Sequence, residues 1–197
     1  IIINNKMWIF FGFLSIVFHI FLIFSGLIPN LISRPLHMAL IIPWIFLYKK
    51  KTIKILSLEF LFTVVGCFSC FWIAINSDML MDQYGFLEND FQVFISITLL
   101  FIVLEMARRS VSWPLPLVSL LALMYGLFGN HIPGEFGHPG TPINSFLGTL
   151  TIAEGGIWGT LTGVSVSIVS IFVIFGSFLN SGEAGSGFMN IATAFAG

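Results

Sequence analysis

The chain has 197 residues, of which 57% are hydrophobic and only 9% are charged, and its mean hydropathy is +1.00. Soluble domains carry about 25% charged residues, so this composition excludes a chain whose whole surface faces water and favours one embedded in a lipid bilayer. The formal net charge of −1 also excludes the basic field that recruits nucleic acid, and no nucleic-acid partner is expected.

Six apolar stretches are long enough to cross a bilayer, because a spanning helix needs roughly 20 residues. They are predicted at residues 7–28, 31–48, 55–75, 86–106, 111–129 and 157–179. None alternates polar and apolar residues with a period of two, as a membrane β-barrel would. The predicted fold class is therefore all-α, a polytopic helical membrane protein with about six transmembrane helices.

The two ends of the sequence suggest a piece of a longer protein. The first residues lack an initiator methionine, and the sequence stops at Gly197 within a helical pattern. The first apolar run lacks the cleavage site of a signal peptide, so we expect it to remain as a membrane segment.

Lysines and arginines gather in loops that simple alternation of the spans places on one side. These residues are Lys6, Lys49, Lys50, Lys51, Lys54, Arg108 and Arg109, and only Arg34 falls on the other side. Short cytoplasmic loops are enriched in positive charge, so both ends of the chain are predicted to be cytoplasmic. Residues 76–90 and 130–156 then form long outer loops, which are either plain connectors or landing surfaces for a soluble partner.

Four histidines fall into two groups. His131 and His138 flank Glu135 in the second outer loop, where a zinc site is conceivable. Their spacing matches no helical pair, which favours loop histidines without a metal. His19 and His37 lie within predicted spans, where a polar side chain usually faces protein or water. A structural hydrogen bond is favoured there over a proton relay.

Nothing in the sequence indicates catalysis. Cys67 and Cys70 form a C-x-x-C inside an apolar run without the βαβ surroundings of a redox motif, which favours two ordinary small residues on a membrane helix. There is no serine, histidine and aspartate arrangement and no phosphate-binding loop. We therefore expect no catalytic or cofactor-binding residue and a chain that is not an enzyme.

Residues 151–164 read TIAEGGIWGTLTGV and crowd four glycines around a tryptophan. Gly155, Gly159 and Gly163 recur every four residues, so on a helix they would share one face. Such a small-xxx-small pattern lets another helix approach closely, and helix packing is the preferred interpretation over a substrate-lining role. Glu154 precedes the apolar run, where a carboxylate suits a helix N-terminus, so a cap or interfacial role is predicted.

Several motifs resemble, in order, the fused permease of tripartite ATP-independent periplasmic (TRAP) transporters. They are LEMARRSVSWPLPL, YGLFG, IPGEFGHPG, TIAEGGIWGTLTGVSVS and IFVIFGSFL, which together span about residues 104–197. RPLHMALIIPWIFLY is similar to the second helix of the same permeases, and residues 1–100 match more loosely. The resemblance is to an N-terminal fragment of the 4TM/12TM type, which works with TAXI-class receptors.

The resemblance implies three parts. Residues 1–109 look like the small four-helix membrane subunit, 110–140 like a connecting transmembrane helix with its periplasmic loop, and 141–197 like the truncated start of the large permease subunit, including a glycine-rich turn SGEAGSG. The alternation of the spans independently requires a connecting helix, because the small subunit ends in the cytoplasm and the large one begins outside.

The resemblance also implies a function. The family takes up organic anions or small organic solutes by secondary transport in the bacterial inner membrane, with Na⁺ as the coupling ion and a periplasmic solute-binding receptor as partner. Its ion and substrate ligands are expected beyond residue 197, in the remainder of the permease, so none is assigned here. A proton-coupled variant and a non-transporting membrane assembly or sensor subunit remain as alternatives.

The predicted orientation can be tested by cysteine labelling. Single cysteines placed in residues 76–90 and 130–156 should react with an impermeant thiol reagent in intact cells, because both loops are expected to face the periplasm. Labelling from the cytoplasmic side alone would contradict the predicted orientation.

Overall fold

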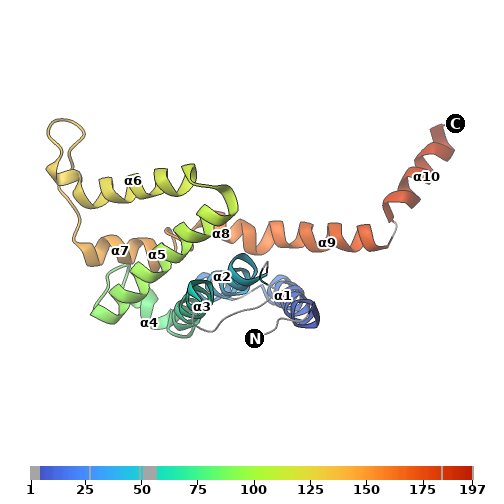
Figure 1. Cartoon of the computed structure of the whole chain (residues 1–197), viewed down its shortest axis with the longest axis horizontal. Helices are drawn as coiled ribbons and strands as arrows, with labels where there is room; N and C mark the ends of the chain where they lie inside the picture. The colour runs from blue at the N-terminus through green and yellow to red at the C-terminus, as the bar shows by residue number, and fades with distance from the viewer. Residues whose placement is uncertain (1–4, 27, 49, 51–56, 183, 197) are drawn as a thin grey trace.

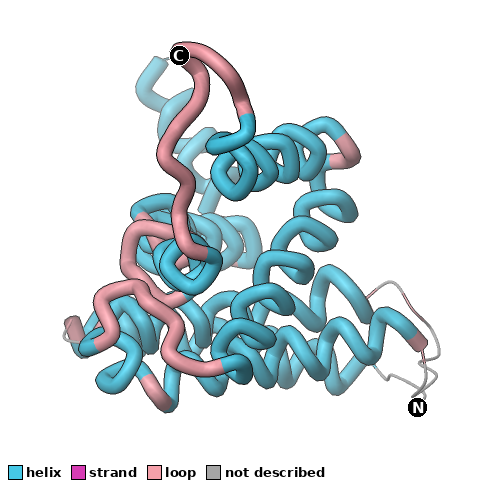
Figure 2. Tube along the Cα trace, turned by 90° about the vertical axis from the view of Figure 1, so that its left-hand side faces the viewer, coloured by secondary structure: helices cyan, strands magenta, loops and turns pink. Residues whose placement is uncertain are grey.

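The computed structural model describes residues 5–26, 28–48, 50, 57–182 and 184–196, and no strand is present among them (Figures 1 and 2). The predicted all-α fold is therefore confirmed. Lys49, Lys51 and Lys54, which contributed to the predicted orientation, lie outside the described residues.

The helices follow one another with short connections. They are α1 (Asn5–Ser25), α2 (Asn30–Leu47), α3 (Leu58–Ile75), α4 (Ser77–Asp82), α5 (Asp90–Val111), α6 (Pro114–Phe128), the 3₁₀ turn η1 (Gly129–His131), α7 (Ile143–Thr151), α8 (Thr160–Val164), the π-helical turn η2 (Ser165–Val169), α9 (Ser170–Ser181) and α10 (Ala184–Ala196). The predicted glycine-rich turn SGEAGSG is thus mostly helical, since α9 continues to Ser181 and α10 begins at Ala184.

Five helices are long and apolar enough to cross a membrane among the described residues. They are α1, α2, α3, α5 and the continuous helix of α8, η2 and α9 from Thr160 to Ser181. The predicted span 111–129 corresponds to α6, which begins at Pro114 and has only 15 residues. At about 1.5 Å per residue it covers roughly 22 Å, less than the hydrocarbon thickness of about 30 Å.

Helices α2, α3 and α5 pack around the main core, and α1 lies beside α2 (Figure 1). Gly66 of α3 makes this approach possible. A methyl group added to Gly66 would lie 3.1 Å from the side chain of Ile42 in α2 and 3.3 Å from that of Ile102 in α5. Ile42, Ile73 and Ile102 are at most 1% exposed, so the three helices share one closely packed interior.

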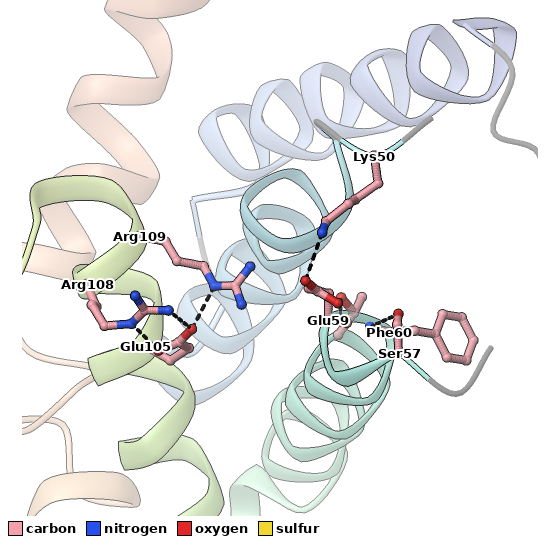
Figure 3. A network of polar contacts seen from close by, with 8 residues as sticks. Lys50, Ser57, Glu59, Phe60, Glu105, Arg108 and Arg109 are labelled. Atoms are coloured by element: carbon pink, nitrogen blue, oxygen red, sulfur yellow. Dashed lines mark hydrogen bonds and ion pairs between the residues drawn. The ribbon is translucent and has the colours of Figure 1, made fainter. Parts of the chain in front are cut away.

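One end of this bundle collects positive charge, and Lys50, Arg108 and Arg109 define it as the basic end (Figure 3). Lys50 Nζ lies 2.9 Å from Glu59 Oε1, which joins the end of α2 to the start of α3. The guanidinium of Arg109 in α5 lies 4.8 Å from the centre of the Phe46 ring in α2. Cations that the sequence places on one side therefore do lie together.

Aromatic side chains accompany the basic end. The rings of Trp8 and Trp44 have centroids 4.7 Å apart, and those of Trp44 and Tyr48 are 5.0 Å apart. Tryptophan and tyrosine are enriched where a membrane meets water. The basic end has the composition expected of an interface between the bilayer and an aqueous compartment.

Both predicted outer loops contain a helix that the sequence analysis left out. Helix α4 lies within 76–90 and α7 within 130–156. Ile143, Phe146 and Leu147 of α7 follow helical spacing, and Leu147 is 4% exposed. Residues 130–156 thus include a helix that packs on α5 and α6 rather than a plain loop.

The docking of α7 depends on a glycine-to-glycine contact, which a substitution can test. A methyl group on Gly148 would overlap the carbonyl oxygen of Gly85, so Gly148→Ala should lower stability by roughly 1–3 kcal/mol through overpacking. Thermal unfolding of the detergent-solubilised protein measures this. Gly176→Ala in α9 is the matched control, because a methyl group there meets nothing within 4 Å. Equal midpoints for the two variants would contradict the close contact.

Candidate functional site

At the opposite end from the basic end, polar side chains of α2 contact the segment 154–165, and His19 of α1 contacts His37, which is one of them. We call this set the polar junction. Its members are His19, Asn30, Arg34, His37, Glu154, Trp158, Gly159 and Ser165. The contacts between α2 and the segment 154–165 join residues more than 120 positions apart in the sequence, so they form a polar link between the first helices and the last spanning helix.

A chain of hydrogen bonds crosses three helices through two histidines. His19 Nδ1 lies 2.7 Å from the carbonyl oxygen of Ser15, His19 Nε2 lies 2.7 Å from His37 Nδ1, and His37 Nε2 lies 3.0 Å from the Ser165 hydroxyl. A carbonyl only accepts, so His19 Nδ1 must donate. In neutral rings His37 Nδ1 then donates to His19, and the hydroxyl of Ser165 donates to His37. The predicted structural hydrogen bonds of both histidines are present.

Arg34 joins α2 to the turn before α8. Its Nη1 donates to the carbonyl oxygen of Trp158 and, at 3.2 Å, to that of Gly159. These residues precede Thr160, where α8 begins, so the guanidinium supplies donors to backbone that lacks a regular helical pattern. Arg34 is the one lysine or arginine that the sequence places on the outer side. Its position apart from the other cations is the sequence feature that could have pointed to this contact with the turn.

Trp158 anchors the same turn in the interior. Its side chain is fully buried, and its indole Nε1 donates to the carbonyl oxygen of Thr151 at 2.7 Å. The hydroxyls of Thr151 and Ser96 lie 2.6 Å apart, which extends the connection to α5. The sequence offered no signal for the Ser96 and Thr151 pair, since isolated hydroxyl residues are common in membrane helices.

The three predicted packing glycines do not share a helix. Gly155 lies in the turn with nothing within 4 Å of an added methyl group, and Gly159 is the N-cap of α8. Only Gly163 lies in α8, where an added methyl group would be 2.9 Å from Nη2 of Arg34. The turn persists because Trp158 anchors it and the Ile157 amide donates to the Leu150 carbonyl at 2.8 Å. The helix-packing role of these glycines stays a prediction.

Glu154 lies beside a different helix from the one expected. Five residues lie between it and Thr160, so it does not cap α8. Its Oε1 instead accepts a hydrogen bond of 3.2 Å from the side chain of Asn30, the first residue of α2. A carboxylate near a helix N-terminus is favourable, and here that helix is α2.

The histidines of the second outer loop have separate contacts, and the ring of His131 lies 6.5 Å from that of Phe128. His138 Nδ1 accepts from the Gly140 amide at 3.1 Å, and its Nε2 then donates to the carbonyl oxygen of Tyr125 at 3.0 Å. Among the residues that the structure describes, no three His, Cys, Asp or Glu side chains come together as metal ligands. Cys67 and Cys70 are free thiols in α3, and Cys67 donates to the carbonyl oxygen of Ala39 at 3.5 Å.

The histidine chain predicts non-additive effects of substitution. Replacing either His19 or His37 by leucine leaves a buried ring nitrogen without its partner, which should lower stability by about 1–3 kcal/mol. The double variant should lose less than the sum of the two single variants, because both partners are then removed together. Denaturant unfolding of the solubilised protein measures all three, with the exposed His131→Leu as control. Strict additivity would show that the two rings do not interact.

Comparison with protein families identifies the second part of the chain. Residues 98–197 match the model of the tripartite ATP-independent periplasmic transporter, DctM component. Comparison with curated proteins gives no match, and neither does comparison with solved structures. The family match begins within α5 and includes every residue that the polar junction contributes from 154 to 165. Because it covers just over half of the 197 residues, the chain belongs to the DctM component family of TRAP transporters.

Proposed function

We propose that this chain forms the N-terminal membrane part of a sodium-coupled secondary transporter of the TRAP type in the bacterial inner membrane. The transported solutes are organic anions or small organic molecules, and a periplasmic receptor of the TAXI type delivers them. The observation that carries the proposal is the match of residues 98–197 to the DctM component, in a chain with five candidate membrane spans. This family is one of permeases, which favours transport over an enzymatic role.

The division of labour proposed for the chain is the one that the family resemblance implies, and the contacts of the polar junction support it. Residues 1–109 act as the small-subunit-like scaffold, 110–140 connect the two parts, and 141–197 begin the large subunit. His37 and Arg34 of the scaffold contact Ser165 and the carbonyl oxygens of Trp158 and Gly159. The polar junction thus fixes the start of the large subunit against the scaffold.

The remainder of the permease is proposed as a further partner, and exposed side chains of α9 and α10 support this. Phe172 and Phe178 of α9 are 69% and 75% exposed, and Phe195 of α10 is 90% exposed. Large exposed apolar side chains on membrane helices suit contact with lipid or with other helices. We assign the ion and substrate ligands to that remainder, beyond residue 197.

Transport by the full-length protein provides the test. The protein and its receptor are reconstituted in vesicles, and uptake of the radiolabelled organic acid that the receptor retains on purification is measured. We expect uptake under an inward Na⁺ gradient and none when choline replaces Na⁺. An equal membrane potential set with potassium and valinomycin controls for voltage.

Two results would contradict the proposal in different ways. Uptake driven by an inward proton gradient without Na⁺ would replace sodium coupling by proton coupling. No uptake under any gradient, with receptor bound to the vesicles, would favour the alternative of a non-transporting assembly or sensor subunit.

A further inference from the structure

The loop that leads from α6 toward α7, residues 129–140, projects beyond the ends of these helices (Figure 1). It contains the motif IPGEFGHPG, to which the proposed function assigns no role. Hydrogen bonds fold this loop back on itself. The amides of Ile132 and His138 donate to the carbonyl oxygen of Gly129 at 3.2 and 3.3 Å, and the hydroxyl of Tyr125 donates to that of Phe136 at 2.8 Å.

The imidazole ring of His138 lies at the base of the loop. Its centre is 5.3 Å from that of the Tyr125 ring, and the two planes meet edge to face at 75°. A methyl group added to Gly129 would overlap the His138 ring, so the ring packs directly on the backbone of Gly129. The ring is thus held between the last turn of α6 and the residues that follow it.

Both ring nitrogens of His138 have backbone partners, and these partners determine which nitrogen carries a proton. The Gly140 amide only donates, so Nδ1, which lies 3.1 Å away, must present a lone pair. The carbonyl oxygen of Tyr125 only accepts, so Nε2, which lies 3.0 Å away, must present its N–H. The bonded ring is therefore neutral, and an imidazolium cannot make both bonds.

Protonation of Nδ1 would affect one end of the loop. Nε2 could still donate to Tyr125, whereas the new N–H would face the N–H of Gly140. Pro139 and Pro142 have no backbone N–H, so Gly140 supplies one of only two amides in the segment 139–142. Loss of its acceptor therefore releases the segment that leads into α7.

The titratable groups around His138 come from the loop itself and from the helices that pack next to it. The loop contributes Glu135 and His131, α6 contributes Tyr125, and α7 contributes none. Helix α5, which packs on α6, has Asp90 in its first turn, while its Glu105 pairs with two arginines at the basic end. Histidine is the side chain whose charge ordinarily changes between pH 5 and 8, and His138 is the one whose protonation removes the Gly140 bond.

We propose that residues 129–140 form a pH-sensitive loop, which neutral His138 holds closed and protonated His138 releases next to α7. Protons reach the ring from the surrounding water, because His138 is partly exposed and the loop around it is open to solvent. The start of α7 therefore responds to the pH of the compartment that the loop faces. This inference goes beyond the proposed function and depends neither on sodium coupling nor on the transported solute.

Amide hydrogen exchange of the full-length protein in detergent tests the proposal. Exchange in the segment 139–142 is measured by mass spectrometry at about pH 7.5 and about pH 5.5, on either side of the usual histidine titration, and is corrected for the intrinsic pH dependence of exchange. Between the two prolines, only Gly140 and Thr141 contribute amides. Protection of Gly140 should fall by roughly tenfold at the lower pH, because its hydrogen bond is lost.

Three variants separate His138 from its surroundings. In His138→Asn the side-chain oxygen can accept from the amide two residues on and does not titrate, so Gly140 should stay protected at both pH values. His131→Gln is the matched control in the same loop and should keep the pH response of the unmodified protein. Gly129→Ala displaces the ring, so protection should be low at both pH values.

Three outcomes would overturn the proposal. Equal protection of Gly140 at both pH values in the unmodified protein would show that the loop does not respond to protons. A pH response that persists in His138→Asn would assign it to another group, such as Glu135. Loss of the response in His131→Gln would assign it to the other histidine of the loop. None of these measurements involves uptake, so failure here is distinct from failure of the transport proposal.

Discussion

Backbone polar groups of a membrane protein need hydrogen-bond partners, and the turn from 152 to 159 lacks the regular partners that a helix provides. The turn interrupts helical hydrogen bonding between α7 and α8. Arg34 donates to its last two carbonyl oxygens, and the Trp158 indole donates back to Thr151. The non-helical turn is held by the side chain of Arg34, which is distant in the sequence, and by that of Trp158, which belongs to the turn itself. The position of the last spanning helix depends on these few bonds.

The same bonds connect the residues before the family match, which begins at residue 98, to the residues within it. The first two helices share little interior with α9, whose side chains are largely exposed. Their link to the last spanning helix is instead the histidine chain from His19 through His37 to Ser165 and the guanidinium of Arg34. Polar contacts in a medium of low dielectric are strong and directional, so a small number suffices to set the geometry. Apolar surface on α9 then remains free for lipid or for further helices.

Five of the six predicted spans correspond to candidate membrane helices, because length and apolar composition are what the sequence displays, whereas 111–129 forms only the 15-residue α6. The helix of residues 143–151 was not predicted because its glycine, asparagine, serine and threonines, which follow Pro139 and Pro142, resemble those of a loop, although Ile143, Phe146 and Leu147 have helical spacing. The glycine prediction was limited for another reason. Glycines that recur every four residues share a helix face only where a helix exists. Here Gly155 and Gly159 lie before the helix begins, in the turn that the buried Trp158 anchors. Such long-range contacts leave no local pattern.

The π-helical turn η2 has a consequence for how the last spanning helix relates to its neighbours. Ser165 lies at its start and is fixed to His37, whereas α9 follows at Ser170. A π-turn contains one residue more than an α-turn, and each residue rotates an α-helix by about 100°. Tightening η2 into an α-turn would therefore turn every side chain of α9 to a new azimuth while the segment before Ser165 stayed bonded to α2. The extra residue of η2 thus sets the direction in which the side chains of α9 point relative to α8.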